Sequence, residues 1–223
     1  MKAEPAARTG TGGVRAADGR VPGRRGQATR QRLLECTAEM LKSASYRDLK
    51  VVDIAKEART SPATFYQYFP DVESAILVLA EQMAEEGQRF ADIVRGGTWR
   101  GKAGYTAALA LVDGFIDFWE DHRAVVRVID LATGEGDGRF ANIRTRLLND
   151  VNNALADVIT EQKVAGRHPA EVAPEAAAGV LVAMLAHVSA HRYGFEFWGV
   201  RTRDLRTSMA RIVYTTVTGQ KPP

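Results

Sequence analysis

The sequence has one cysteine, Cys36, in 223 residues. One cysteine cannot form an internal disulfide, which is typical of a protein in a reducing cytoplasm. Long apolar runs are also missing: the longest nearly uncharged stretch, 176–190, has about 15 residues, whereas a membrane-spanning helix needs roughly 20. The N-terminus lacks the apolar segment of a signal peptide. We therefore expect a cytoplasmic protein with no membrane partner.

Catalytic and metal-binding motifs are scarce. No G-x-S-x-G nucleophile motif occurs, and the glycine-rich segment 134–138 has no preceding strand pattern and carries two acids that would repel phosphate. His187 and His191 have the spacing of a zinc pair, but Val188 stands where a catalytic Glu would be, and no third ligand is evident. We predict no enzyme activity, metal or cofactor, and assign both histidines to a pocket or an interface.

Charge is unevenly distributed along an otherwise ordinary globular composition, with 45% hydrophobic and 26% charged residues. Residues 1–70 hold 13 Lys and Arg against 7 Asp and Glu, whereas residues 71–223 hold 17 against 20. A polyanion such as DNA would therefore be attracted to the first part of the chain and not to the second.

Two short helices joined by a tight break are predicted over residues 51–69. Apolar residues recur at helical spacing in the first, namely Val51, Ile54, Ala55 and Ala58. Ser61 stands where an N-cap oxygen would accept a free backbone N–H, and Pro62 follows at the first helical position. Phe65 and Phe69 give the second helix a narrow apolar stripe. The remaining small, hydroxyl and amide side chains suit a DNA groove, so the pair has the dimensions of a helix-turn-helix.

Residues 1–23 are rich in Gly and Arg and have almost nothing to bury, so we expect a disordered tail. Arg20, Arg24 and Arg25 precede the first predicted helix. They form either an arm that contacts DNA phosphates or the minor groove, or only a solubilising tail.

Helical spacing, interrupted by Gly and Pro, continues to the end of the chain, and no stretch has a strand pattern. The further predicted helices cover 27–43, 72–95, 102–120, 123–132, 139–164, 174–195 and 203–218. The prediction is an all-α protein with a three-helix helix-turn-helix domain over 24–71. A larger helical bundle for ligand binding and dimerisation follows over 72–223.

The stretch 29–78 resembles the DNA-binding domain of the tetracycline-repressor (TetR) family of bacterial transcription regulators, and the consensus aligns without a gap. The matching residues are Thr29, Arg30, Leu33, Leu34, Tyr46, Val51, Asp53, Ile54, Ala55, Ala58, Ser61, Pro62, Thr64, Phe65, Tyr66, Tyr68, Phe69, Pro70 and Glu73. Residues 79–223 match the family only in length and in being helical.

The chain departs from the family pattern at several positions. The family usually has Gly where Ser45 and Arg59 stand, and both positions tend to require a left-handed backbone, which costs a non-glycine residue roughly 1 kcal/mol. Ala63 replaces a frequent Gly, Lys50 replaces a Ser or Thr cap, and Val72 replaces a Lys that contacts phosphate. The candidates to supply that contact are Lys50, Lys56 and Arg59.

The resemblance implies that the second short helix lies in the major groove and that Tyr66 binds phosphate. The candidate DNA-contacting residues are Lys50, Ser61, Pro62, Ala63, Thr64, Tyr66, Gln67, Tyr68, Arg24 and Arg25. Gln67 is the best candidate for base contact, because its amide can pair with both groups of an adenine edge. Tyr66 and Tyr68 have hydroxyls suited to phosphate, and the alternative for either is packing in the core.

One such domain covers little DNA, so a homodimer on a palindromic operator is expected, with recognition helices about 34–36 Å apart. The last two helices are the candidates for its interface, through Ala176, Ala177, Ala178, Gly179, Leu181, Ala183, Met184, Ala186, Ile212, Val213 and Val217. An equal alternative is that these side chains face the core of their own subunit.

Aromatic bulk in the second part indicates a pocket for a small apolar or aromatic effector. The candidate ligand-binding residues are Trp99, Phe115, Phe118, Trp119, Met184, His187, His191 and Trp198. The alternative is that the aromatics only fill the core. An effector that favours a conformation with wrongly spaced recognition helices would release DNA. The leading hypothesis is therefore a ligand-responsive, dimeric repressor. One competing hypothesis is an all-α small-molecule-binding protein or enzyme that does not bind DNA, and another is a DNA-binding protein without an effector.

Overall fold

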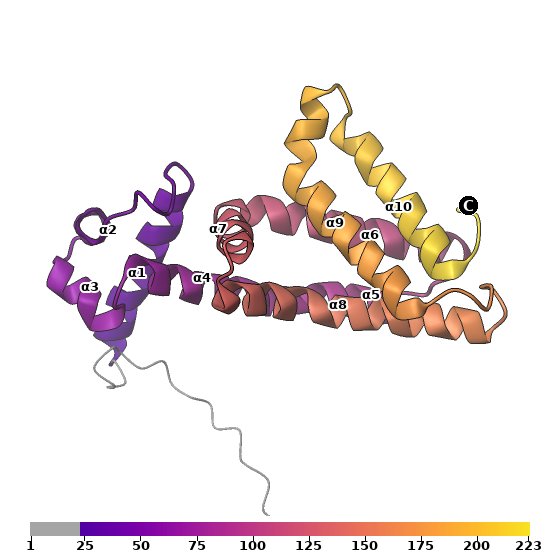
Figure 1. The fold of residues 1–223 in the computed structure, drawn as a ribbon, viewed down its shortest axis with the longest axis horizontal. Coiled ribbons are helices and arrows are strands. Elements are labelled where there is room, and N and C mark those ends of the chain that lie inside the picture. Colours follow the sequence, from indigo (N-terminus) through magenta and orange to yellow (C-terminus); the bar gives the residue numbers. More distant parts are fainter. Residues whose placement is uncertain (1–22) are drawn as a thin grey trace, which may run out of the picture. The chain divides into compact units, whose positions relative to one another are not determined.

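The computed structural model describes residues 23–223, in which helices are joined by turns and loops (Figure 1). Arg20 and the predicted tail, apart from Gly23, lie outside the described residues. The described part contains ten helices and no strand, which confirms the all-α prediction. The helices are α1 (Arg24–Leu41), α2 (Val51–Glu57), α3 (Pro62–Tyr68), α4 (Val72–Glu86), α5 (Gln88–Gly96), α6 (Gly101–Asp121), α7 (Arg123–Gly134), α8 (Gly138–Val164), α9 (Pro174–Phe197) and α10 (Thr202–Thr218).

Local side-chain caps set several of the helix boundaries. The Asp71 carboxylate accepts the backbone N–H of Ser74 at 2.7 Å and so begins α4. At the start of α8, the Asp137 carboxylate accepts the backbone N–H of Arg139 at 2.8 Å. Hydrogen bonds from the Arg139 side chain lower the pKa of Asp137 to about 2. Gly219, with a left-handed φ of 68°, ends α10.

The prediction of a single helix over 72–95 is wrong, because the helix is interrupted at Gly87 and forms α4 and α5. The N–H of Gly87 bonds the carbonyl of Ala84, three residues back, at 3.1 Å. A Cβ on Gly87 would lie 2.3 Å from Cδ1 and 3.0 Å from the carbonyl oxygen of Leu147 on α8. The break therefore occurs where only glycine allows the chain to pass this close to α8.

The chain divides into two compact units at Ile76 and Leu77, within α4. In the first unit α1, α2 and α3 pack on one another around a small apolar core. Its buried side chains include Leu33, Leu34, Ile54, Phe65 and Phe69.

The second unit is a helical bundle with an aromatic core. Phe90 of α5 stacks on Phe115 of α6 with ring centroids 4.2 Å apart, and Phe115 stacks in turn on Trp119 at 5.3 Å. The long helix α8 packs against α5 and α9, and α10 packs against α6 (Figure 1). Asp113 of α6 pairs with Arg206 of α10, with Oδ2 and Nη2 2.6 Å apart, and this raises the pKa of Arg206. Among residues 23–223, no helix is long and apolar enough to cross a membrane.

Candidate functional site

The turn between α2 and α3 has the geometry predicted for a helix-turn-helix. Ser61 is extended, with φ −96° and ψ 155°, and its Oγ accepts the backbone N–H of Thr64 at 3.2 Å. Pro62 occupies the first turn of α3, where its missing N–H costs no hydrogen bond. The predicted cap of the recognition helix is confirmed.

Of the two positions predicted to be left-handed, only one is. Arg59 has φ 55° and is the one non-glycine residue with positive φ among residues 23–223. The prediction for Ser45 is wrong, because the turn after α1 closes without a left-handed residue at that position. The strain expected from the family comparison is therefore confined to the turn of the helix-turn-helix, at Arg59.

The helix α3 buries one edge and exposes the other. Phe65 and Phe69 are 0% and 2% exposed and form the buried edge. Pro62, Ala63, Tyr66 and Gln67 are exposed, whereas Thr64 and Tyr68 are half-buried. The ring of Tyr66 stands edge-on to Phe65 with centroids 6.0 Å apart, and the residue is 53% exposed. The alternative that Tyr66 packs in the core is therefore rejected.

The cations assigned to DNA are also at the surface, but two of them differ from the prediction. Lys50 is the exposed, extended residue that precedes α2. Arg24 and Arg25 are exposed but form the first turn of α1, where the carbonyl of Gly23 accepts the N–H of Gln27 at 2.9 Å. The prediction that they precede the first helix is therefore wrong, and their contact with DNA stays a prediction.

Arg30 is a further cation of this unit, and it was not among the predicted DNA-contacting residues. Its guanidinium lies 5.1 Å from the centroid of the Phe69 ring, and its Nε is buried without a hydrogen-bond partner. Burial lowers the pKa of Arg30 from its ordinary value. The signal available in the sequence was only that Arg30 belongs to the residues shared with the family.

The predicted ligand-binding residues do not form one pocket. Trp99 is 5% exposed, donates from Nε1 to the carbonyl of Val94 at 2.9 Å, and lines a hollow of about 510 Å³ between α5 and α8. Phe115 and Phe118 are fully buried in the aromatic core. Trp119 and His191 line a different hollow of about 240 Å³.

The remaining predicted ligand residues lie on α9. Met184 is half-buried, whereas His187, His191 and Trp198 are exposed. The two imidazole rings stack with centroids 4.2 Å apart, and Nδ1 of His191 lies 2.9 Å from the carbonyl oxygen of His187. Within residues 23–223, no group of three or more His, Cys, Asp or Glu is placed to hold a metal ion.

A capped helix-turn-helix that exposes a polar edge, joined to a separate helical unit, is the arrangement of a DNA-binding transcription regulator. Residues 33–74 match the model described as bacterial regulatory proteins of the tetR family, and residues 90–223 match the tetracyclin repressor-like C-terminal domain. The second match alone covers more than half of the chain. The chain belongs to the TetR family and is a DNA-binding transcription regulator. The competing hypothesis of a protein that does not bind DNA is thereby rejected.

Individual relatives agree with this assignment. An HTH-type transcriptional regulator of Haemophilus influenzae is 24% identical over 150 residues, which cover 67% of this chain and 72% of the relative. Among solved structures, GusR of Salmonella enterica has a TM-score of 0.60 at 21% identity, covering 86% of this chain and 94% of its own. FadR of Bacillus subtilis in complex with stearoyl-CoA has a TM-score of 0.61 at 15% identity, covering 85% and 98%. Both solved structures share the fold of this chain.

Proposed function

We propose that the protein acts as a homodimer that binds a near-palindromic operator through α3 and leaves it when a small effector binds the helical domain. The observation that carries the proposal is the division of α3 into two edges. Phe65 and Phe69 fix the helix to its own unit, while Tyr66 and Gln67 are left exposed. A short helix held in this way can enter a major groove without losing its core contacts.

Each exposed group has a role that follows from its chemistry. The Gln67 amide contacts a base edge, because it offers one donor and one acceptor side by side. The Tyr66 hydroxyl, Lys50 and the cations Arg24 and Arg25 contact phosphate oxygens, which fix register without specifying sequence. Ala63 lies at the start of α3, where its small side chain allows close approach to a thymine methyl.

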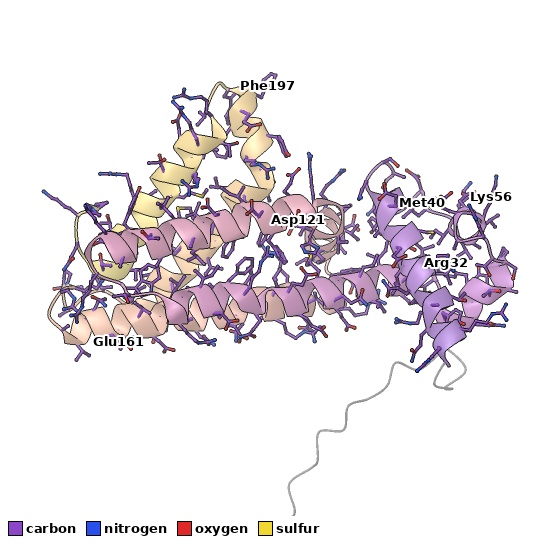
Figure 2. All side chains as sticks on the ribbon, turned by 180° about the vertical axis from the view of Figure 1, so that it is seen from behind. Arg32, Met40, Lys56, Asp121, Glu161 and Phe197 are labelled. Atoms are coloured by element: carbon purple, nitrogen blue, oxygen red, sulfur yellow. The ribbon has the colours of Figure 1, made fainter. Side chains whose placement is uncertain are left out.

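An exposed stripe on α9 supports a dimer. Its members recur every three or four residues and so share one face: Ala176, Val180, Ala183, His187, His191, Gly194 and Trp198. Val180 and Trp198 are 69% and 75% exposed, and the adjacent Phe197 is 88% exposed at the C-terminal end of α9 (Figure 2). Exposed apolar side chains toward both ends of one helix face support an interaction surface along it. A second copy of the chain is the partner that a palindromic operator requires.

The predicted interface needs a correction in its detail. Five of the predicted residues are at most 4% exposed in the single subunit, so for them the alternative of a core position holds: Ala178, Leu181, Ala186, Val213 and Val217. Ile212 of α10, which is 47% exposed, remains available for an interface.

The effector site is proposed within the helical domain. Hollows between bundled helices are common ligand sites, and the second unit contains several. The FadR structure of Bacillus subtilis, which shares this fold, contains stearoyl-CoA. That ligand belongs to FadR, and for this chain it supports only that such a domain can accommodate a small molecule.

Selection from a random duplex library tests the DNA part of the proposal. Purified protein is expected to enrich an inverted repeat whose half-site centres are about 10 base pairs, or a multiple of that, apart. Its affinity for mixed-sequence DNA is expected to fall linearly with the logarithm of salt concentration, since phosphate contacts release counterions. Enrichment of half-sites without two-fold symmetry would reject the dimeric arrangement, and salt-independent binding would reject the phosphate contacts.

A further inference from the structure

The second unit contains a hollow of about 240 Å³ that is lined by both aromatic rings and arginines. It lies between the C-terminal end of α6, α7 and the C-terminal half of α9. Its lining includes two aromatic rings and three arginines, namely Trp119, Tyr193, Arg123, Arg127 and Arg192, together with Asp130, His191 and the buried Ser189. The volume is below the 300–1,000 Å³ typical of drug-sized ligand sites, so the hollow suits a small molecule.

One arginine of this wall is fixed and neutralised inside the protein. Arg192 donates from Nη2 to the Glu120 carboxylate, and the Tyr193 hydroxyl donates to the two oxygens of the same carboxylate at 2.7 and 2.9 Å. Hydrogen bonds from Tyr193 and Arg192 lower the pKa of Glu120, which therefore stays ionised. These contacts hold the Tyr193 ring in place at the rim of the hollow.

The other two arginines have weaker links to carboxylates than Arg192 has. The one acid in the lining, Asp130, pairs with Arg144, with Oδ1 and Nε 3.3 Å apart. Arg123 lies 4.5 Å from the centroid of the Tyr193 ring, and its charge contributes to the lowered pKa of Glu120. Arg127 forms no ion pair within residues 23–223. Both residues are exposed and line the hollow. The site therefore has excess positive charge directed at whatever enters it.

An unpartnered hydroxyl supplies a second, independent indication of a ligand. Ser189 lines the hollow and is 1% exposed, and its Oγ is buried without a hydrogen-bond partner. A serine within a helix ordinarily bonds the carbonyl four residues back or points to solvent, and Ser189 does neither. A buried hydroxyl without a partner is costly unless a ligand atom satisfies it.

From this geometry we infer that the hollow binds a small aromatic carboxylate. The carboxylate pairs with Arg127 and Arg123, the ring lies against Trp119 and Tyr193, and Ser189 provides a hydrogen bond. Arginine is suited to this role because its planar guanidinium matches a carboxylate with two parallel hydrogen bonds. The inference rests on the proposed function in one respect, since it names the chemical class of the effector.

Calorimetric titration of the purified full chain with benzoate, phenylacetate and indole-3-acetate tests the inference. Benzamide, which lacks the charge, and inorganic phosphate, which lacks the ring, are titrated in parallel. At least one of the three carboxylates is expected to bind saturably and more tightly than benzamide and phosphate. Failure of all three to bind at millimolar concentration would overturn the inference, as would equal binding of benzamide. Tighter binding of phosphate would overturn the aromatic part of it.

Substitutions locate the binding in this hollow. Arg127→Gln removes one charge at the surface and is expected to weaken binding about tenfold, because a hydrogen bond to a charged group is lost. Ser189→Ala removes only the unpartnered hydroxyl and is expected to weaken binding several-fold without loss of folding. Arg146→Gln alters a comparable exposed arginine of α8 outside the hollow and should leave binding unchanged. Unchanged binding in both Arg127→Gln and Ser189→Ala would overturn the site.

DNA release is measured separately, on an operator obtained by selection, so that the two proposals fail in different ways. A carboxylate that binds in the hollow but leaves operator affinity unchanged supports the site and contradicts its role as the effector site. Release of DNA by other compounds, with no carboxylate bound, overturns the site and leaves the proposed effector response intact.

Discussion

Ser61 and Thr64 share two contacts at the start of α3. The backbone N–H of Thr64 donates to Oγ of Ser61 at 3.2 Å, and the hydroxyl oxygens of the two residues lie 3.0 Å apart. The Thr64 hydroxyl is therefore engaged within the protein, which favours its methyl group, rather than its hydroxyl, as the part that contacts a base.

Removing the cap should destabilise the first unit. Ser61→Ala deletes the acceptor for the Thr64 N–H and is expected to lower the free energy of unfolding by about 1 kcal/mol. Ser61→Asp keeps an acceptor at the cap and should retain most of the stability, while its charge weakens DNA binding by repelling phosphate. Urea unfolding and binding to mixed-sequence DNA measure the two effects. Equal stability of Ser61→Ala and the natural protein would show that the cap contributes nothing.

The Gln67 amide is the group that we assign to base contact. Gln67→Ala is expected to cost about 1–3 kcal/mol on the selected operator and to relax the preference at one position of each half-site. Binding to random DNA should change little, because the amide carries no charge. Tyr66→Phe is the matched comparison, and its loss of a phosphate contact should weaken binding to specific and random DNA alike. An unaltered ratio of specific to random affinity in Gln67→Ala would reject the base contact.

Arg59 holds the left-handed position between α2 and α3, with φ 55°. Glycine adopts this conformation without the clash of a Cβ, so Arg59→Gly should be more stable than Arg59→Ala by about 1 kcal/mol. Both variants lose the same charge, so their difference isolates the backbone from any contact of the guanidinium. Thermal unfolding measures it. A more stable alanine variant would mean that the turn imposes no strain at this residue.

The exposed face of α9 predicts a specific dependence of the dimer on Val180. Val180→Lys places a charge within the proposed interface and is expected to weaken dimerisation by about 2–4 kcal/mol. Val164→Lys is the control, because Val164 is 85% exposed at the end of α8 and lies outside the α9 stripe. Light scattering after size exclusion should find the first variant monomeric and the second dimeric. A dimer that survives Val180→Lys would move the interface elsewhere.

The features predicted correctly from the sequence are those with local causes. The Ser61–Pro62 pair predicts where α3 begins. Helical spacing interrupted by Gly and Pro predicts the ends of α6 to α10 to within about two residues of the observed ends. The division of α3 into buried phenylalanines and exposed polar groups follows from the same spacing. These predictions depend only on residues close together in the sequence and not on which side chains pack across the core.

The features that were missed depend on residues far apart in the sequence. Phe115 and Phe118 were predicted to bind a ligand because aromatic residues are concentrated in this part of the sequence. Both instead fill the core beside Phe90. The hollow with excess positive charge combines Arg127 of α7 with Ser189 of α9, which are 62 residues apart. No spacing rule brings such residues together, because their proximity depends on how α7 and α9 pack.

The helix break at Gly87 depends on Leu147, a residue far away in the sequence, and substitution of Gly87 tests this dependence. Its backbone is right-handed helical, with φ −62° and ψ −18°, so alanine is conformationally allowed there. The obstacle is Leu147, which is 4% exposed and whose Cδ1 would lie 2.3 Å from the new Cβ. Gly87→Ala should therefore lower the free energy of unfolding by about 1–3 kcal/mol through overpacking.

Two further variants separate this contact from the loss of glycine itself. Gly96→Ala, at the end of α5, meets nothing within 4 Å and should be neutral or stabilising by about 0.5–1 kcal/mol. Leu147→Ala removes Cδ1, the nearest part of the obstacle, and leaves the carbonyl oxygen at 3.0 Å. The double variant Gly87→Ala with Leu147→Ala should therefore lose less stability than the sum of the two single losses, because residues in contact are not additive. Strict additivity in chemical unfolding would mean that Gly87 and Leu147 do not touch, and the break between α4 and α5 would then need another cause.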